Sequence, residues 1–319
     1  MKHRYQVYSK RLGLGVVTVL FLLPLILYSR LFFLRPPSTN QQRVLFDGIV
    51  YQRQVHSTPR PQIIHLIAVD LTKPGVRVLV TPAKTTLEHE QSQARTTSEF
   101  VREFQVQLAM NANFFYPFRE NSPWDYYPHS GDGVNLVGQA ISNGDQYSSA
   151  EASWPVLCFV NNNRAQILES GDCPQGTQMA IAGNQILLKD GIPVKLAQSS
   201  AKDKPYARAA VALNEEGHKL WLIVVDGKQP FYSEGVTMLE LTEIVRELGA
   251  HTALNLDGGG SSTLVMATSN GSTLLNSPIQ NKLPMNERPI ANHLGFYANA
   301  YQAPTIPLSS SKGLPSPEG

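Results

Sequence analysis

The segment NLDGGGSSTLV, Asn255 to Val265, places one carboxylate beside three consecutive glycines and two serines. Glycine weakens a strand, because it loses the most backbone entropy on folding and has no side chain to pack. Here the glycines would let a ligand approach the backbone and would expose N–H groups that suit an anionic oxygen such as phosphate. Ser261 and Ser262 add hydroxyl donors. The structural alternative is a tight Asp-Gly turn that Asp257 caps.

Polar residues also stand at the ends of other predicted strands, where loops converge. Carboxylates there can do acid–base chemistry, amides can bind sugar hydroxyls or phosphate oxygens, and guanidinium groups suit phosphate. The residues are Asp226 after LWLIVV, Asn111 and Asn113 in AMNANFF, Arg208 before AAVAL, and Arg288 and Asn292 in ERPIANHLG. Each alone is compatible with a surface charge or a cap, but their shared position at strand ends makes them candidates for one site.

Several common catalytic patterns are missing from the sequence. The histidines, among them His129, His251 and His293, do not have metal-ligand spacing, and neither HExxH nor an EF-hand loop occurs. A GxSxG nucleophile elbow does not occur either. The sequence therefore predicts no metal site and no cofactor.

Two helices are expected to deliver the chain into these strands. Thr96 with Glu99, and Thr237 with Glu240, form capping-box patterns ahead of apolar residues at helical spacing. Gly249 stands where a C′ glycine belongs.

Strand signals dominate the rest of residues 44–301. The clearest are IIHLIAVDL, VRVLV, PVLCFV with RAQIL, RAAVAL with KLWLIVV, and IANHLGFYA. Many strands with few helices predict an α+β domain around a mixed, strand-rich sheet. No internal repeat or composition break divides the domain.

Composition limits the class of partner. Of 319 residues, 42% are hydrophobic and only 16% charged, with a net charge of +2. The scattered Lys and Arg residues form no basic field, so no nucleic-acid partner is predicted.

The N-terminus carries Lys2, Arg4, Lys10 and Arg11 ahead of an apolar run from Leu12 to Tyr28. Ser29 and Arg30 interrupt this run, and LFFL continues it to Leu34. This is long enough for a transmembrane helix with a cytoplasmic N-terminus; a cleaved signal peptide is the alternative.

The predicted organisation is therefore a basic tip and membrane anchor over residues 1–34, a linker over 35–43, the globular domain over 44–301 and a disordered Pro/Ser/Gly-rich tail over 302–319. The domain is expected outside the cytoplasm, periplasmic or extracellular. An exported chain can keep a disulfide between Cys158 and Cys173, but the sequence does not give their separation and leaves the bridge open.

The chain resembles the phosphodiester glycosidase family. The matching segments run from about Ala109 to Ala298, and the block from Trp221 to Val265 is the most specific. They are MNANFF, AIAGNQILLKDG, ARAAVAL, LIVVDGKQPFYSEGVTMLELTEIVRELGA, TALNLDGGGSSTLV and RPIANHLGFYA.

The resemblance implies hydrolysis of a sugar 1-phosphodiester at the anomeric carbon, on an envelope polysaccharide or glycolipid. A phosphate monoester is a good leaving group, so the chemistry needs cations and N–H donors around the phosphate and a carboxylate near the anomeric carbon. Asp257 would be nucleophile or base, with Asp226 as the second carboxylate. The substrate-binding candidates are Asn111, Asn113, Arg208, Gly258, Gly259, Gly260, Ser261, Ser262, Arg288 and Asn292.

Two other functions stay open. A phosphodiesterase would cleave the P–O bond instead, and a polysaccharide-binding or assembly protein would use the same cleft without catalysis. The stereochemical outcome is open too, because it depends on a carboxylate separation that the sequence does not supply.

Overall fold

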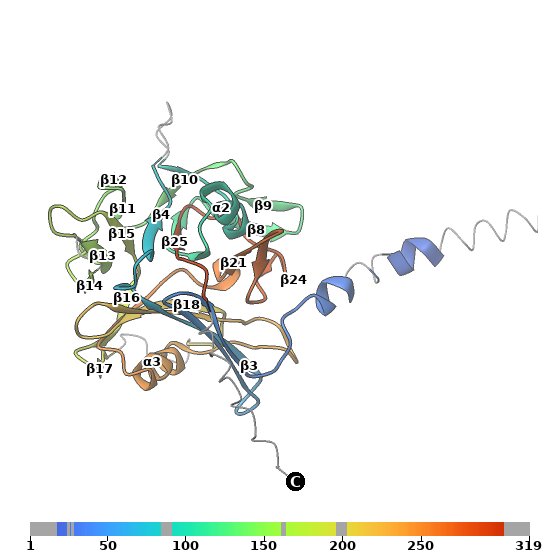
Figure 1. The fold of residues 1–319 in the computed structure, drawn as a ribbon. Coiled ribbons are helices and arrows are strands. Elements are labelled where there is room, and N and C mark those ends of the chain that lie inside the picture. The colour runs from blue at the N-terminus through green and yellow to red at the C-terminus, as the bar shows by residue number, and fades with distance from the viewer. Residues whose placement is uncertain are drawn as a thin grey trace, which may run out of the picture.

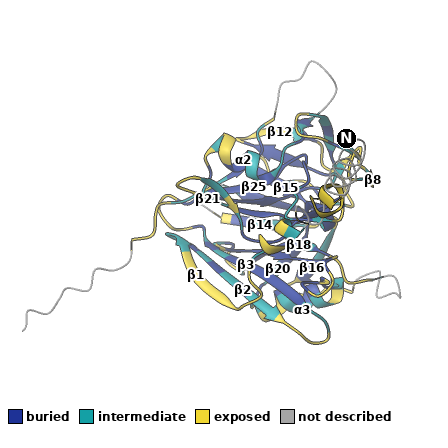
Figure 2. Ribbon diagram, turned by 90° about the vertical axis from the view of Figure 1, so that its right-hand side faces the viewer, coloured by how far each residue is buried: buried dark blue, intermediate teal, exposed yellow. Residues whose placement is uncertain are grey.

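An eight-stranded antiparallel sheet forms the base of the globular domain in this computed structural model, which describes residues 18–23, 26, 29–83, 91–160, 164–195 and 203–302. In spatial order its strands are β1 (Gln41–Phe46), β2 (Ile49–His56), β3 (Gln62–Asp70), β19 (Lys219–Val225), β18 (Arg208–Leu213), β20 (Thr252–Asn255), β16 (Gln185–Lys189) and β17 (Ile192–Pro193). The edge strand β1 is largely exposed, whereas the central strands are buried (Figure 2).

Two five-stranded sheets lie above the large sheet (Figure 1). One runs β22 (Gly271–Leu274), β21 (Leu264–Thr268), β6 (Leu108–Asn111), β25 (His293–Tyr297) and β4 (Arg77–Val80). The other runs β12 (Asp145–Ser148), β11 (Ala140–Ser142), β15 (Met179–Ala182), β13 (Val156–Val160) and β14 (Arg164–Leu168).

Three smaller sheets complete the strand list. They are β5 (Ser92–Gln93) with β10 (Gly133–Leu136) and β7 (Phe115–Tyr116), the pair β23 (Ile279–Gln280) and β24 (Leu283–Pro284), and the pair β8 (Arg119–Ser122) and β9 (Asp125–Tyr127).

The predicted strand-rich architecture with few helices is confirmed. The prediction of a mixed parallel and antiparallel sheet is wrong for the described strands. All pairings between named strands are antiparallel. The connection through helix α3 (Met238–Glu247) explains the difference, because it joins β19 to β20 across the intervening β18. β19 and β20 therefore run in the same direction without pairing.

The main core fills the space between the large sheet and the sheet that contains β6. Ile67 and Val211 from below meet Met110 and Phe296 from above, all fully buried. Helix α3 covers the other face of the large sheet, where Leu241 and Val245 pack on Ala210 and Ile223. Because both faces of the sheet are covered, the central strands are apolar throughout instead of alternating.

Local signals behave as the sequence predicts. Both capping boxes form, at helix α2 (Thr97–Phe104) and at α3. Gly249 follows the C-cap of α3 with φ +72°, the left-handed conformation that glycine adopts without steric cost.

The N-terminal segment is helical at residues 18–23 and 29–33. Among the described residues we find no helix that combines the length and the apolar character needed to cross a membrane. Part of the predicted span, residues 12–17, 24, 25, 27 and 28, lies outside the described residues, as do residues 303–319 of the predicted tail.

The predicted linker is partly strand, because β1 begins at Gln41. Its earlier part contacts the domain: Arg53 Nε donates to the Thr39 carbonyl at 2.8 Å, and the Tyr232 hydroxyl donates to the Pro36 carbonyl at 3.0 Å.

Cys158 and Cys173 form a disulfide, with their Cα atoms 5.8 Å apart. It ties β13 to the loop that follows β14. The sequence had left this pairing open.

Candidate active site

Two neighbouring strands of the large sheet bring Arg208 and Asp257 to the same edge. β18 and β20 pair with Ala210 opposite Asn255, and this register extended by two residues places Arg208 opposite Asp257. The link continues past the strands, since Leu256 N donates to the Ala209 carbonyl at 2.9 Å and Gly259 N to the Ala207 carbonyl at 2.8 Å. Antiparallel pairing thus makes neighbours of residues that are far apart in the sequence.

A pocket of about 500 Å³ opens at this edge. A volume of this size suits a small molecule. The pocket is lined by Phe114, Phe115, Phe118, Asn184, Gln185, Asp203, Tyr206, Arg208, Met238, Asn255, Leu256, Asp257, Gly258 and Arg288. Four predicted site residues, Asp257, Gly258, Arg208 and Arg288, therefore share one cavity.

Asp257 has an environment suited to acid–base or nucleophilic chemistry. Burial raises the pKa of its carboxyl to about 6, while a hydrogen bond from Ser261, the positive charge of Arg288 and the Gly258 N–H oppose the rise. Its own main chain is fixed, because Asn111 Nδ2 donates to the Asp257 carbonyl at 2.6 Å. A pKa near neutrality and a fixed backbone are what a catalytic carboxylate requires.

Arg288 is buried, and all three of its guanidinium nitrogens form hydrogen bonds with the protein. Its Nε donates to Gln280 Oε1 at 2.6 Å, Nη1 to Ser261 Oγ at 3.2 Å and Nη2 to Glu120 Oε2 at 2.7 Å. The guanidinium carbon lies 4.2 Å from the centroid of the Phe118 ring. These contacts fix the guanidinium plane at the pocket wall.

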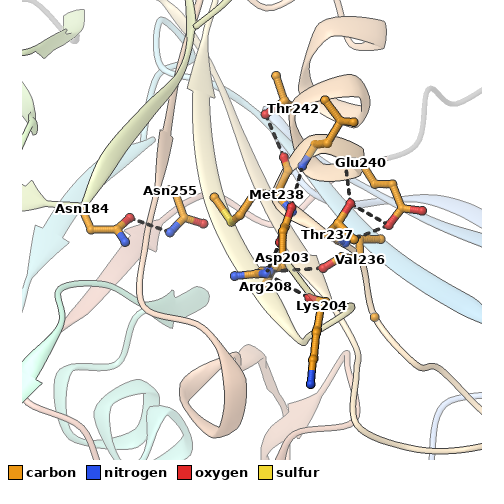
Figure 3. Close-up of polar contacts among 12 residues, drawn as sticks. Asn184, Asp203, Lys204, Arg208, Val236, Thr237, Met238, Glu240, Thr242 and Asn255 are labelled. Atoms are coloured by element: carbon orange, nitrogen blue, oxygen red, sulfur yellow. Dashed lines mark hydrogen bonds and ion pairs between the residues drawn. The ribbon is translucent and has the colours of Figure 1, made fainter. Parts of the chain in front are cut away.

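Arg208 is fixed by the start of helix α3 (Figure 3). Its Nε donates to the Val236 carbonyl at 3.2 Å, and its Nη2 lies 3.2 Å from Asp203 Oδ1. Asp203 also accepts from Met238 N at 2.8 Å, so one carboxylate serves the helix N-terminus and the arginine together.

The glycine segment lacks side chains mainly because other protein groups lie against its backbone. Gly259 has φ +63°, and a Cβ there would lie 2.6 Å from the Tyr206 ring. A Cβ on Gly260 would lie 2.7 Å from Cζ of Arg288. The N–H groups of Gly259, Ser261 and Ser262 donate to carbonyls of Ala207, Gly258 and Gly259. Glycine at these two positions thus lets Tyr206 and Arg288 approach the backbone. Of the glycine N–H groups expected to face a ligand, that of Gly259 is already bonded within the protein.

Asp226 lies outside the pocket. Its side chain has no exposed surface, and its oxygens accept from Asn276 Nδ2 at 3.0 Å and Ser277 N at 2.9 Å and pair with His65 Nε2 at 3.0 Å. This placement gives no support to the predicted role of second catalytic carboxylate.

The predicted amides are buried and bind the protein itself. Asn113 and Asn292 hydrogen-bond to each other, and Asn113 also donates to the carbonyls of Val137 and Gln139. Asn111 joins Asp257 to Thr263, whose N–H donates to Asn111 Oδ1. Ser262 Oγ is buried without a hydrogen-bond partner among the described residues. These side chains shape the loops behind the pocket instead of lining it.

Several residues around the pocket were not anticipated from the sequence. They are Phe114, Phe115, Phe118, Glu120, Asn184, Gln185, Asp203, Tyr206, Met238, Asn255, Leu256 and Gln280. The aromatic string FFYPF from Phe114 was a usable signal, because clustered aromatic side chains beside a polar site suit a sugar face. Asp203 and Glu120 stand in segments with no pattern of their own.

Over the part of the chain that the structure describes, no group of three or more His, Cys, Asp and Glu side chains is placed to hold a metal ion.

Comparison with known proteins identifies a family over a large part of the globular domain. A family model described as phosphodiester glycosidase matches residues 104–297. No match is found among curated proteins.

Three solved structures share the fold. The catalytic domain of zebrafish N-acetylglucosamine-1-phosphodiester alpha-N-acetylglucosaminidase, auto-inhibited by its pro-peptide, is 20% identical, with a TM-score of 0.56 over 82% of this chain and 88% of that one. A hypothetical protein from Synechocystis is 15% identical, with a TM-score of 0.60 over 83% of this chain, which spans only 64% of the Synechocystis chain. A protein described as exported, from Burkholderia pseudomallei K96243, is 13% identical, with a TM-score of 0.53 over 74% of each chain.

Proposed function

This chain belongs to the phosphodiester glycosidase family, and from that membership we propose that it hydrolyses a sugar 1-phosphodiester at the anomeric carbon. One observation carries the proposal: a carboxylate with a raised pKa, Asp257, shares a pocket with the guanidinium groups of Arg208 and Arg288. The zebrafish relative is named for such a bond, between N-acetylglucosamine and phosphate.

Different residues of the pocket act on the phosphate and on the sugar. Arg208 and Arg288 hold the phosphate and stabilise the negative charge that grows on it as the C–O bond breaks. Asp257 acts at the anomeric carbon, either as nucleophile or as base for a water molecule. The leaving phosphate is stable as an anion, so protonation of the leaving oxygen matters less than in an ordinary glycosidase.

The remaining walls suit a sugar ring. Phe114, Phe115, Phe118 and Tyr206 supply aromatic surface. Asn255 donates to Asn184 Oδ1 at 2.7 Å, while its own Oδ1 is buried without a partner among the described residues. A sugar hydroxyl that donated to this oxygen would remove the cost of an unpaired buried acceptor.

Hydrolysis in ¹⁸O-labelled water tests the bond that is cleaved. We expect the label in the released sugar, because water or Asp257 attacks the anomeric carbon. Label in the phosphate would instead support a phosphodiesterase that cleaves P–O. Tight glycan binding with no product at high protein concentration would support the non-catalytic alternative.

The pH dependence of turnover follows from Asp257. The carboxyl must be ionised to act as nucleophile or base, so kcat/KM should rise tenfold per pH unit below a pKa of about 6 and level off above it. In Arg288→Gln the positive charge that lowers this pKa is lost, so the rising limb should move to higher pH. A profile without a limb between pH 5 and 7, or one that Arg288→Gln leaves in place, would contradict this assignment.

We place the globular domain outside the cytoplasm, on an envelope polysaccharide or glycolipid, with the apolar N-terminal segment as anchor. The Cys158–Cys173 disulfide supports an oxidising compartment. Protease treatment tests the location. A protease that reaches the outer side of the cytoplasmic membrane should cut the domain while that membrane is intact. Digestion that requires the cytosol to be opened would contradict this location.

A further inference from the structure

A second pocket, of about 490 Å³, lies where the N-terminal segment meets the edge of the large sheet. It is lined by Leu34, Arg35, Pro36, Pro37, Thr39, Asn40, Gln41, Arg43, Tyr51, Arg53, Thr273, Leu274 and Leu275. Residues of β1 and β2 line this pocket, whereas the active-site pocket lies at β18 and β20. In the sheet order, β3 and β19 separate these two strand pairs, so the pockets are distinct.

The lining of this pocket is cationic. Arg35, Arg43 and Arg53 all contribute to it, and none of the lining residues is acidic. Neither Arg43 nor Arg53 forms an ion pair with a carboxylate of the described chain. Positive charges gathered in one pocket repel one another, so an anion bound among them would stabilise the arrangement.

Arg53 is a built part of the site, because only 5% of its surface is exposed. Its Nε and Nη2 donate to the carbonyl and hydroxyl oxygens of Thr39, at 2.8 and 3.3 Å. These bonds are to neutral groups, so an anion that reached the guanidinium would add an ion pair that the described residues do not supply.

The buried carboxylate of Asp226 is connected to the pocket wall by hydrogen bonds, but its oxygens are used by other groups. Tyr51 lines the pocket, and its hydroxyl lies 2.9 Å from His65 Nδ1. His65 in turn contacts Asp226, whose oxygens are occupied by His65, Asn276 and Ser277. Asp226 is therefore linked to Tyr51 through His65, and it is not among the residues that line the pocket.

We propose that this pocket binds a phosphate-bearing group. Guanidinium forks match phosphate oxygens, and three of them beside the hydroxyl and amide groups of Thr39, Asn40 and Gln41 form a suitable set. The group comes from one of two sources: a phospholipid headgroup beside the predicted anchor, or a soluble phosphate ester.

Binding to the full-length chain in a non-ionic detergent tests this. The probes are inorganic phosphate and glycerol 1-phosphate by calorimetry, and nanodiscs of phosphatidylcholine with or without phosphatidic acid. Arg43→Gln combined with Arg53→Gln should weaken binding of one or both kinds of probe about tenfold or more, because two charge-assisted contacts are lost. The matched control is Arg77→Gln, which removes an exposed arginine that lies over Tyr297.

The single variants keep the test decisive. Arg43 is exposed, and its guanidinium carbon lies 5.7 Å from the centroid of the Tyr51 ring, so Arg43→Gln should weaken binding with little change in the melting temperature. Arg53→Lys keeps the charge and should bind better than Arg53→Gln. Turnover of a sugar phosphodiester should be unchanged in Arg43→Gln, which separates this site from the catalytic one.

The two kinds of probe also identify where the phosphate group comes from. Loss confined to phosphatidic acid nanodiscs assigns a lipid headgroup, and loss with the soluble probes assigns a soluble ester. Equal affinity of the double variant and the unmodified protein for every probe would overturn the proposal.

Discussion

Asp257→Asn is expected to lower kcat for a sugar 1-phosphodiester by roughly 1,000-fold or more, the scale of losses when a catalytic carboxylate or triad member is removed. The amide is nearly the same size, so it keeps the pocket intact but cannot attack the anomeric carbon or accept a proton from water. Steady-state kinetics with a chromogenic sugar phosphodiester measures the effect.

The same substitution should not destabilise the fold at neutral pH. Burial raises the pKa of Asp257 to about 6, so the folded protein binds this proton more tightly than the unfolded chain does. The contribution of this group to the free energy of unfolding therefore falls as pH rises from about 4, the unfolded value, through about 6. Above that window Asp257→Asn removes an unfavourable buried charge, and its stability should equal or exceed that of the unmodified protein.

The matched control is Asp190→Asn, an identical chemical change at an exposed turn with φ +51°. It should leave both turnover and stability near their original values, because asparagine tolerates this conformation. Unchanged turnover in a folded Asp257→Asn variant would remove Asp257 from the mechanism.

Asp226→Ala is expected to lower the free energy of unfolding by about 3–5 kcal/mol, because each buried donor that loses its acceptor costs about 1–3 kcal/mol. The substitution removes the acceptor of three buried N–H donors: His65 Nε2, one N–H of Asn276 Nδ2, and Ser277 N. Urea denaturation measures the change. Asp47→Ala, which removes an exposed ion pair with Lys73 at 3.8 Å, should cost no more than about 1 kcal/mol.

Turnover distinguishes a structural Asp226 from a catalytic one. Asn276 also donates to the Ser262 carbonyl at 3.0 Å, so loss of Asp226 loosens the support of the glycine segment. Turnover per folded molecule should therefore fall, but far less than in Asp257→Asn. A stable Asp226→Ala protein with no turnover would restore the role of second catalytic carboxylate.

The alternation of side chains along a strand explains why the role of Asp226 could not be assigned from the sequence. It follows β19 at the same edge of the sheet as Arg208, as predicted. Val225 pairs with Arg208 and packs on the side of α3. Successive side chains point to opposite faces, so Asp226 turns away from Arg208, toward His65. Which face a strand-end residue takes depends on register, and register is set by pairing between distant segments.

Local patterns were more informative. Thr96 and Thr237 cap helices as predicted, because a capping box involves residues only three apart. The meeting of Asp257, Arg208 and Arg288 also followed from strand ends and from the family resemblance. Glu120 could not be found this way, since it contacts Arg288 across 168 positions of sequence and comes from a hairpin without a distinctive pattern.

The most direct measurement of the central claim is a crystal structure of Asp257→Asn with a bound sugar 1-phosphodiester. We expect the phosphate oxygens to contact the guanidinium groups of Arg208 and Arg288, with the anomeric carbon facing residue 257 and the sugar against Phe114, Phe115 or Tyr206. A diester bound elsewhere, or bound here with its phosphorus instead of its anomeric carbon beside residue 257, would contradict it.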